Sequence, residues 1–279
     1  MPSAYLLVSH GSRDPRPEIA MQQLARLVRN KLDNSSNQTS AINGVVSQSK
    51  YEKLVGIAYL EMSPQPLSEQ IQQFAKSAFC DACLEKFRSA EAAAPTFRCG
   101  ELRQLSQNEN HLKIVPLFLL PGVHVMTDIP AEVALAQSAL SQDIMIDLQP
   151  YLGSHPDLEK LLAKQIATIK AEAWILLTHG SRRPDSEKPV QAIARSLGAV
   201  VAYWSVPASL ESRVKELVAA GYREIAILPY FLFAGGITDA IAASIEELKL
   251  QFSAVNFQLA EPLGASAELA ELIWDLTDQ

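Results

Sequence analysis

The chain has 279 residues, of which 48% are hydrophobic and 20% charged, and this is the composition of a folded globular protein. A net charge of −7 excludes a general electrostatic attraction to nucleic acid. The longest apolar runs are too short to span a bilayer, and three cysteines are an odd number for a secreted disulfide scaffold. We therefore expect a cytoplasmic protein that binds neither nucleic acid nor a membrane.

Short apolar runs alternate with amphipathic stretches along the whole chain. The first half predicts strands over 5–9, 54–60 and 113–120, with helices over 17–31, 66–78 and from about residue 130. The second half predicts strands over 175–178, 200–204 and 224–231. Apolar strands joined by helical crossovers are typical of a parallel sheet covered on both faces. The fold class that follows is α/β, with doubly wound parallel sheets.

Three sequence motifs occur twice, in the same order. The pairs are YLLVSHGSR with WILLTHGSR, KIVPLFLLPG with IAILPYFLFAGG, and LQPYLGSHPDLEKLL with LAEPLGASAELAELI. Internal repetition of this kind indicates a duplicated domain. We expect two domains, residues 1–171 and 172–279, that face a central cleft. The first is longer because of insertions near 33–50, expected to be a surface loop, and 79–110, which holds all three cysteines.

Three side chains able to bind a metal follow three strands of the first half. His10 comes directly after the first strand, Glu61 follows the second, and His124 lies just beyond the third. In an open parallel sheet, ligands bind at the carboxyl ends of the strands, so these residues emerge at one edge. Two imidazoles and one carboxylate suit Fe²⁺ or Co²⁺, and three protein ligands leave positions free for exchange. Asp128, four residues after His124, is in place to orient that histidine.

A histidine after a strand is often only a hydrogen-bonded turn residue, and a lone glutamate there is usually solvated. The second half serves as an internal control for the cluster. His179 is retained, but Ser205 stands opposite Glu61, and the turn that carries His124 becomes AGGITD. We therefore expect His179 to be structural or part of the cleft wall, and the chain to hold one metal site.

The chain resembles the class II sirohydrochlorin chelatases of the CbiX and SirB type, in their two-repeat form. The resemblance rests on LLVSHGSRDP, AYLEMSPQPL, VPLFLLPGVHVMTDIP and YLGSHPDL, and it covers essentially the full length. It implies an enzyme that inserts Co²⁺ or Fe²⁺ into sirohydrochlorin for cobalamin or sirohaem biosynthesis, with the metal as substrate and no permanently bound cofactor. The catalytic and metal-handling residues it implies are His10, Glu61 and His124.

The implied pigment carries several carboxylates, and its macrocycle is flat and apolar. Ser12, Arg13 and the amides around Gly11 are therefore expected to anchor it, with Arg182 and Arg183 facing them from the other domain. The segment LFLLPGV is expected to line one wall of the cleft. A two-domain chain can form this cleft within itself, so a monomer is expected.

Other interpretations of the same residues remain. The metal can be cobalt or iron, and any of the three ligands can accept the pyrrole protons. A metal carrier without a pigment would use the same ligands, and a phosphotransfer enzyme would phosphorylate His10 beside Arg13. Cys80, Cys83 and Cys99 are interpreted as reduced thiols, although His111 offers a fourth ligand for a metal.

Overall fold

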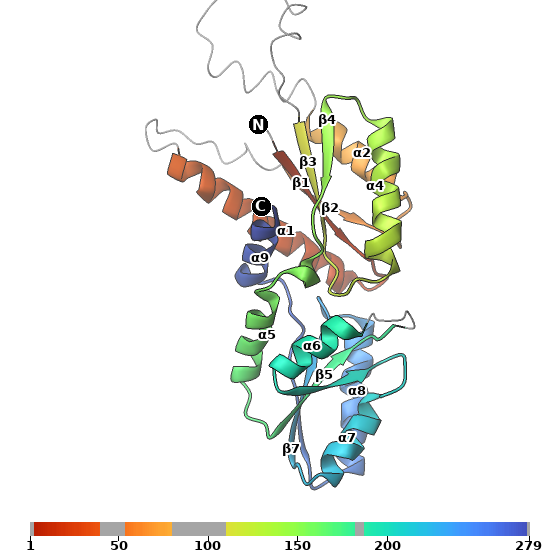
Figure 1. The fold of residues 1–279 in the computed structure, drawn as a ribbon, viewed down its shortest axis with the longest axis vertical. Coiled ribbons are helices and arrows are strands. Elements are labelled where there is room, and N and C mark those ends of the chain that lie inside the picture. Colours follow the sequence, from red (N-terminus) through yellow and green to blue (C-terminus); the bar gives the residue numbers. More distant parts are fainter. Residues whose placement is uncertain (1–2, 40–53, 80–109, 182–186, 278–279) are drawn as a thin grey trace, which may run out of the picture.

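The computed structural model describes residues 3–39, 54–79, 110–181 and 187–277, and the side chains of 33–39 are not among them. The described chain forms two four-stranded parallel sheets, one in each half (Figure 1). The strand order is β2-β1-β3-β4 in the first sheet and β6-β5-β7-β8 in the second. In both sheets, the first strand of that half takes an inner position, and the later strands are added on either side of it. The predicted fold class, a duplicated doubly wound α/β fold, is confirmed.

The elements of the first half are β1 (Ser3–Ser9), α1 (Pro15–Thr39), β2 (Val55–Tyr59), α2 (Leu67–Ala78), β3 (Asn110–Pro116), a π-helix η2 (His124–Asp128), α4 (Ile129–Ala139), β4 (Ile144–Leu148), a 3-10 helix η3 (Leu152–Ser154) and α5 (Leu158–Ala167). The elements of the second half are β5 (Ala173–Thr178), α6 (Lys188–Ser196), β6 (Ala199–Tyr203), α7 (Leu210–Ala219), β7 (Glu224–Pro229), α8 (Gly236–Gln251), β8 (Asn256–Leu259) and α9 (Ala267–Thr277). None of the described helices combines the length and the apolar character that a membrane crossing requires.

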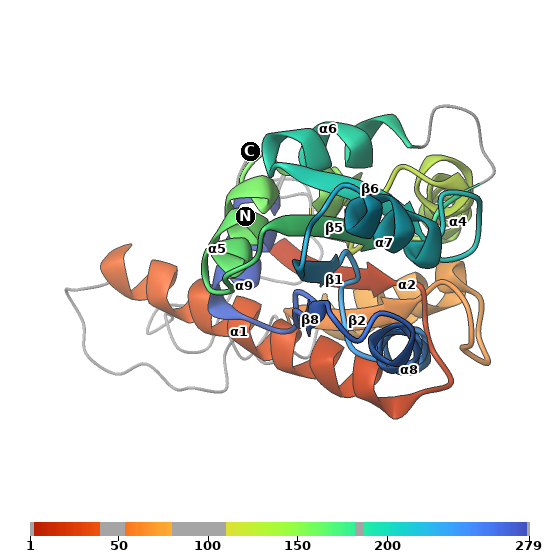
Figure 2. The same cartoon turned by 90° about the horizontal axis from the view of Figure 1, so that it is seen from below.

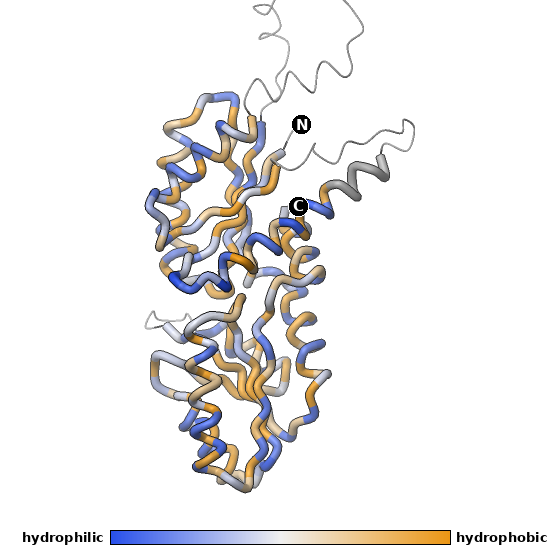
Figure 3. Tube along the Cα trace, turned by 180° about the vertical axis from the view of Figure 1, so that it is seen from behind, coloured by the Kyte–Doolittle hydropathy of each residue, from blue (hydrophilic) through white to orange (hydrophobic). Residues whose placement is uncertain are grey.

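Helices cover both faces of each sheet, which explains why the inner strands are apolar throughout. In the first half, α2 and α4 pack against one face around Leu6, Ile71 and Ile114. In the second, α7 and α8 pack against the corresponding face around Ile175 and Ile227. Figure 2 shows α6 and α8 on opposite sides of the second sheet, and Figure 3 shows hydrophobic residues concentrated along the strands.

The last helix of each half packs on the other half. Helix α9 follows β8 but lies against α1 and β3 of the first half, where the rings of Trp274 and Tyr5 are in contact, tilted by 46° with centroids 5.9 Å apart. Helix α5 follows β4 but lies beside the second sheet, and Leu158 and Leu162 belong to the same buried cluster as Leu176 (Figure 1). This exchange produces one continuous core that joins the two sheets.

The structure corrects several of the predicted elements. Helix α1 runs on to Thr39, so the beginning of the expected loop at 33–50 is helical; no Gly or Pro between Lys31 and Thr39 stops the helix. Strand β3 ends at Pro116 rather than at residue 120, and β7 ends at Pro229 rather than at residue 231. Strands β4 and β8 were not predicted, because each is a short edge strand without a continuous buried run. The remainder of that loop and the three cysteines lie outside the described residues.

Candidate metal centre

The three predicted ligands meet at the carboxyl edge of the first sheet. His10 leaves β1, Glu61 leaves β2, and His124 opens the π-helix that follows β3. The ladder between β1 and β2 continues past both strands, because the Glu61 amide donates to the His10 carbonyl over 2.8 Å. The backbone hydrogen bond therefore holds His10 and Glu61 side by side.

The side chains converge on one small volume. The Nε2 atom of His10 lies 3.8 Å from Oε2 of Glu61, and Nε2 of His124 lies 4.0 Å from Oε1 of the same carboxylate. One ligating atom from each of the three residues lies within 4.8 Å of the others. Metal–nitrogen and metal–oxygen bonds measure about 2.0–2.2 Å, so an ion between these atoms needs only small side-chain rotations. The side chains are partly open to solvent, with 51% of His10 and 34% of His124 exposed.

The carboxylate of Asp128 orients the ring of His124, as the sequence predicts. The Nδ1 atom of His124 lies 2.7 Å from Oδ2 of Asp128, so the ring donates its Nδ1 proton to this carboxylate. The lone pair of the neutral ring is then on Nε2, which faces Glu61. The two residues are four positions apart and stand at the first and last positions of the π-helix.

We predict that Asp128→Asn lowers the affinity for Co²⁺ by about 10- to 100-fold, because losing the carboxylate frees the tautomer and the orientation of His124. Titration with Co²⁺ measures the change. A matched control is Asp143→Asn, which replaces an exposed aspartate elsewhere in the same half. Equal affinities for Asp128→Asn and the wild type would show that the contact does not prepare the ligand.

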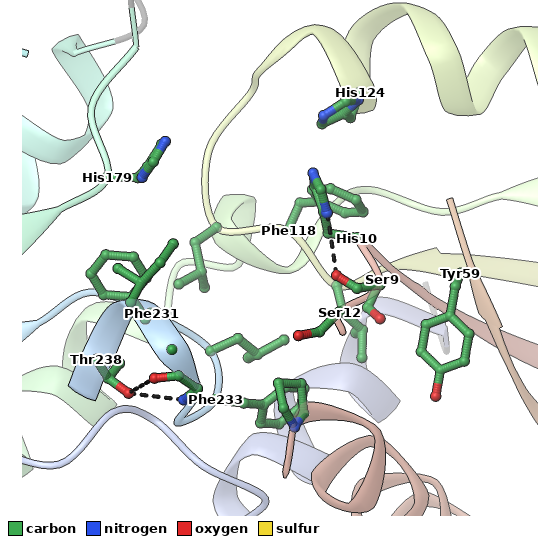
Figure 4. Close-up of a pocket in the computed structure, with 18 of the residues that line it drawn as sticks. Ser9, His10, Ser12, Tyr59, Phe118, His124, His179, Phe231, Phe233 and Thr238 are labelled. Carbon is green, nitrogen blue, oxygen red and sulfur yellow. Dashed lines mark hydrogen bonds between the residues drawn. The ribbon is translucent and has the colours of Figure 1, made fainter. Parts of the chain in front are cut away.

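A cleft of about 640 Å³ lies between the two halves, with His10 and His124 on one wall and His179 on the other (Figure 4). Much of its apolar lining comes from the duplicated segments after β3 and β7, namely Leu117, Phe118, Leu119, Leu120, Phe231, Leu232 and Phe233. Of the LFLLPGV segment that the sequence placed on a wall of the cleft, the first four residues, 117–120, line it, and 121–123 do not. The Tyr230 hydroxyl donates to the Leu119 carbonyl over 3.3 Å and ties the two walls together. The cleft can thus accept a flat apolar molecule beside the three ligating groups.

The structure places only some of the expected anchor residues at the cleft. Gly11 and Ser12 line the cleft, whereas Arg13 is exposed and is not among the lining residues. Arg182 and Arg183 lie outside the described residues. Among the described residues, His111 is far from this site in the sheet, at the start of β3, where its Nδ1 pairs with Oδ2 of Asp147 over 2.7 Å.

Arg16 was missed by the sequence reasoning, and it joins the two halves at the cleft. Its guanidinium donates to both carboxylate oxygens of Asp239, at 2.9 and 2.5 Å, and to Asp14, which directly precedes α1. Asp239 lies in the first turn of α8, beside cleft residues Gly236 and Thr238. The partners are 223 positions apart, so no local pattern could have indicated the pair. We call Arg16, Asp14 and Asp239 the clasp.

The hydrogen bonds from the Arg16 guanidinium, together with its charge, lower the pKa of both clasp carboxyls, that of Asp14 to about 2. A carboxyl whose pKa is lower in the folded state contributes stability that is lost as the pH falls through that pKa. We predict that Asp239→Asn lowers the melting temperature slightly and equally at pH 7 and pH 5. The difference in melting temperature between the variant and the wild type should shrink below about pH 4, where carboxyls become protonated. It should also shrink in 1 M salt, which screens the ion pair. Glu246→Gln, which breaks an exposed pair within α8, is the control; a difference that grows as the pH falls would contradict the pairing.

The second half keeps the scaffold of the site without its ligands. The Ser205 amide donates to the His179 carbonyl over 2.9 Å, as the Glu61 amide does to His10. The Ser205 hydroxyl turns back to the same carbonyl over 2.7 Å instead of reaching into the cleft. Within the described chain, the only group of three or more potential metal ligands is the one formed by His10, Glu61 and His124. His179 is part of the cleft wall, which is one of the two roles expected of it.

Known proteins share this architecture. The structure of SirB from Bacillus subtilis with Fe³⁺ superposes with a TM-score of 0.64 at 20% identity, covering 100% of this chain and 95% of SirB. At 20% identity, this similarity shows that the two proteins share a fold. Two such sheets around a cleft, with an open histidine–glutamate cluster beside it, have the α/β fold of the chelatases.

The chain belongs to the CbiX family, whose model matches residues 87–169 and 173–279. It is 26% identical over 206 residues to the sirohydrochlorin ferrochelatase of Priestia megaterium, covering 69% of this chain and 76% of that protein. It is 23% identical over 182 residues to the sirohydrochlorin cobaltochelatase of the same organism, covering 60% of this chain and 59% of that protein. The similarity to a known family that the sequence motifs indicate is confirmed.

Proposed function

We propose that this protein is a sirohydrochlorin chelatase that inserts Co²⁺ or Fe²⁺ into the metal-free tetrapyrrole, for cobalamin or sirohaem biosynthesis. The observation that carries the proposal is the convergence of His10, Glu61 and His124, two of which, His10 and His124, line an apolar cleft. The related ferrochelatase and cobaltochelatase support the same chemistry and leave both metals open. In this account the ion and the pigment are both substrates, and no resident cofactor takes part.

The three ligands are proposed to hold the ion with positions left open for the pyrrole nitrogens. Each ligand is a single side chain near solvent, so the ion can exchange its bonds one at a time as it moves toward the cleft. The tetrapyrrole is proposed to lie against the apolar segments around Phe118 and Phe231, which remove its flat faces from water. Gly11 and Ser12, which line the cleft, are proposed to bind its carboxylates, and Arg13, Arg182 and Arg183 stay predictions as anchors.

Both walls of the cleft come from one chain, and we therefore propose that a monomer is active. The division into domains 1–171 and 172–279 also stays a proposal, in which the first domain carries the ion and the second completes the cleft. A cytoplasmic location remains a prediction from composition.

The test is the absorption spectrum of sirohydrochlorin mixed with protein and Co²⁺ or Fe²⁺ under anaerobic conditions. We expect the spectrum of the metallated pigment to appear much faster than in buffer. A metal carrier would bind Co²⁺ without changing the rate. A phosphotransfer enzyme would leave the pigment unchanged and would hydrolyse phosphate esters.

A further inference from the structure

His179 lies on the cleft wall opposite the metal centre and has no part in it. Figure 4 shows its ring on the second half, across the cleft from His10 and His124. The residue is exposed, and within the described chain its ring has no hydrogen-bond partner; only its backbone carbonyl is used, by Ser205. It is therefore an imidazole that is free to react with whatever occupies the cleft.

Insertion of a divalent ion into a tetrapyrrole, the proposed function on which this inference rests, requires the loss of two pyrrole N–H protons. The groups that hold the ion are poorly placed to take them. The Nε2 atoms of His10 and His124 face the carboxylate of Glu61, so their lone pairs are committed while the ion is bound. The other nitrogen of His124 donates to Asp128, and that of His10 lies 3.3 Å from the Gly11 carbonyl. A further base is needed.

The other titratable groups that line the cleft are less suited to this task. Burial raises the pKa of Tyr230, and burial together with the nearby charge of Glu18 raises that of Tyr59 to about 12, so both phenols stay protonated at neutral pH. Glu18 itself lines the cleft, on α1. A carboxylate is a weaker base than an imidazole, and proton transfer is most efficient when the acceptor titrates near the working pH.

We propose that His179 is the catalytic base that removes the pyrrole protons, from the face of the pigment opposite the incoming ion. A neutral ring nitrogen of His179 takes the proton as the pyrrole N–H bond breaks, and the electron pair stays on the pyrrole nitrogen. That nitrogen becomes a donor to the metal. Because His179 is exposed, the imidazolium returns its proton to water, and the ring can then accept the second one. The second half, which lacks the counterparts of Glu61 and His124, thus contributes its histidine to proton removal rather than to metal binding.

The test uses His179→Ala in the full-length protein, with sirohydrochlorin and Co²⁺. We expect kcat to fall on the order of a hundredfold, the scale of a lost general base, while the affinity for Co²⁺ alone changes by less than about twofold. Imidazole added to the buffer should restore a large part of the lost rate, because a small base can enter the vacated space. The control is His111→Ala, which removes a histidine at the far end of β3 and should show neither the loss nor the rescue.

Several outcomes would overturn the proposal. His179→Ala could keep the wild-type kcat, or its loss could be unaffected by imidazole, which would indicate damage to the cleft wall. Weaker binding of Co²⁺ alone would make His179 a metal ligand. A comparable loss in Glu18→Gln with full activity in His179→Ala would move the base to Glu18. If the wild type itself does not metallate the pigment, the proposed function fails instead, so the two failures are distinguishable.

Discussion

Replacing either histidine of the metal centre, as His10→Ala or His124→Ala, is expected to lower kcat/KM for metallation by at least about a hundredfold. Loss of a residue that only supports a metal ligand already lowers metal affinity or activity by about 10- to 100-fold. Here a ligand itself is removed. The remaining imidazole and carboxylate would hold the ion too weakly to present it to the pigment. Metallation rates and Co²⁺ titrations should show parallel losses.

Neither substitution should unfold the protein, because both side chains are partly exposed and neither belongs to a buried cluster. Unchanged melting temperatures are therefore part of the expected result. A variant that keeps its affinity for Co²⁺ would show that the ion binds elsewhere, and the cysteines at 80, 83 and 99 would be the first residues to test.

The second large effect is expected from Gly11→Ala. Gly11 has φ +94°, and a Cβ atom there would lie 2.0 Å from the Glu61 carbonyl oxygen. The left-handed backbone alone costs about 1–3 kcal/mol for another residue, and the clash must be relieved by separating the ends of β1 and β2. His10 and Glu61 would move apart, so both the melting temperature and the affinity for Co²⁺ should fall.

Gly180→Ala is the matched control for this change. Gly180 has φ +85° in the equivalent turn of the second half, but its Cβ would meet the Val206 side chain at 2.7 Å rather than a ligand's backbone. It should lower the melting temperature and leave Co²⁺ affinity near the wild-type value. If both variants lose Co²⁺ binding equally, the close packing of Gly11 on Glu61 is not what positions the ligands.

The sequence predicted the candidate metal centre because His10 and Glu61 lie just beyond strand ends, and His124 lies in the segment that follows the third strand. His10 directly follows an apolar run, and parallel strands bring their carboxyl ends to one edge, so local pattern and sheet geometry suffice. The same logic predicted Asp128, which lies one helical turn from His124. The doubled HGSR segment predicted the duplication, and the missing counterparts of Glu61 and His124 predicted that the second half would lack the cluster.

What the sequence did not predict depends on how the halves pack. The clasp between Arg16 and Asp239 and the exchange of α5 and α9 arise between segments far apart in the chain, where no periodicity connects them. The end of α1 was missed for a local reason, since a Ser- and Asn-rich segment has weak helix propensity but contains nothing that stops a helix. The short edge strands β4 and β8 lack the long buried run that identifies the inner strands.

The central claim is that an ion held by His10, Glu61 and His124 is the ion that enters the pigment. A single-turnover experiment tests it most directly: protein loaded with one equivalent of Co²⁺ is freed of unbound metal, then mixed with excess sirohydrochlorin. We expect close to one equivalent of cobalt pigment from the wild type and almost none from His124→Ala treated in the same way. Loaded wild-type protein that retains its Co²⁺ in the presence of the pigment, or a His124→Ala variant that delivers as much, would contradict this account.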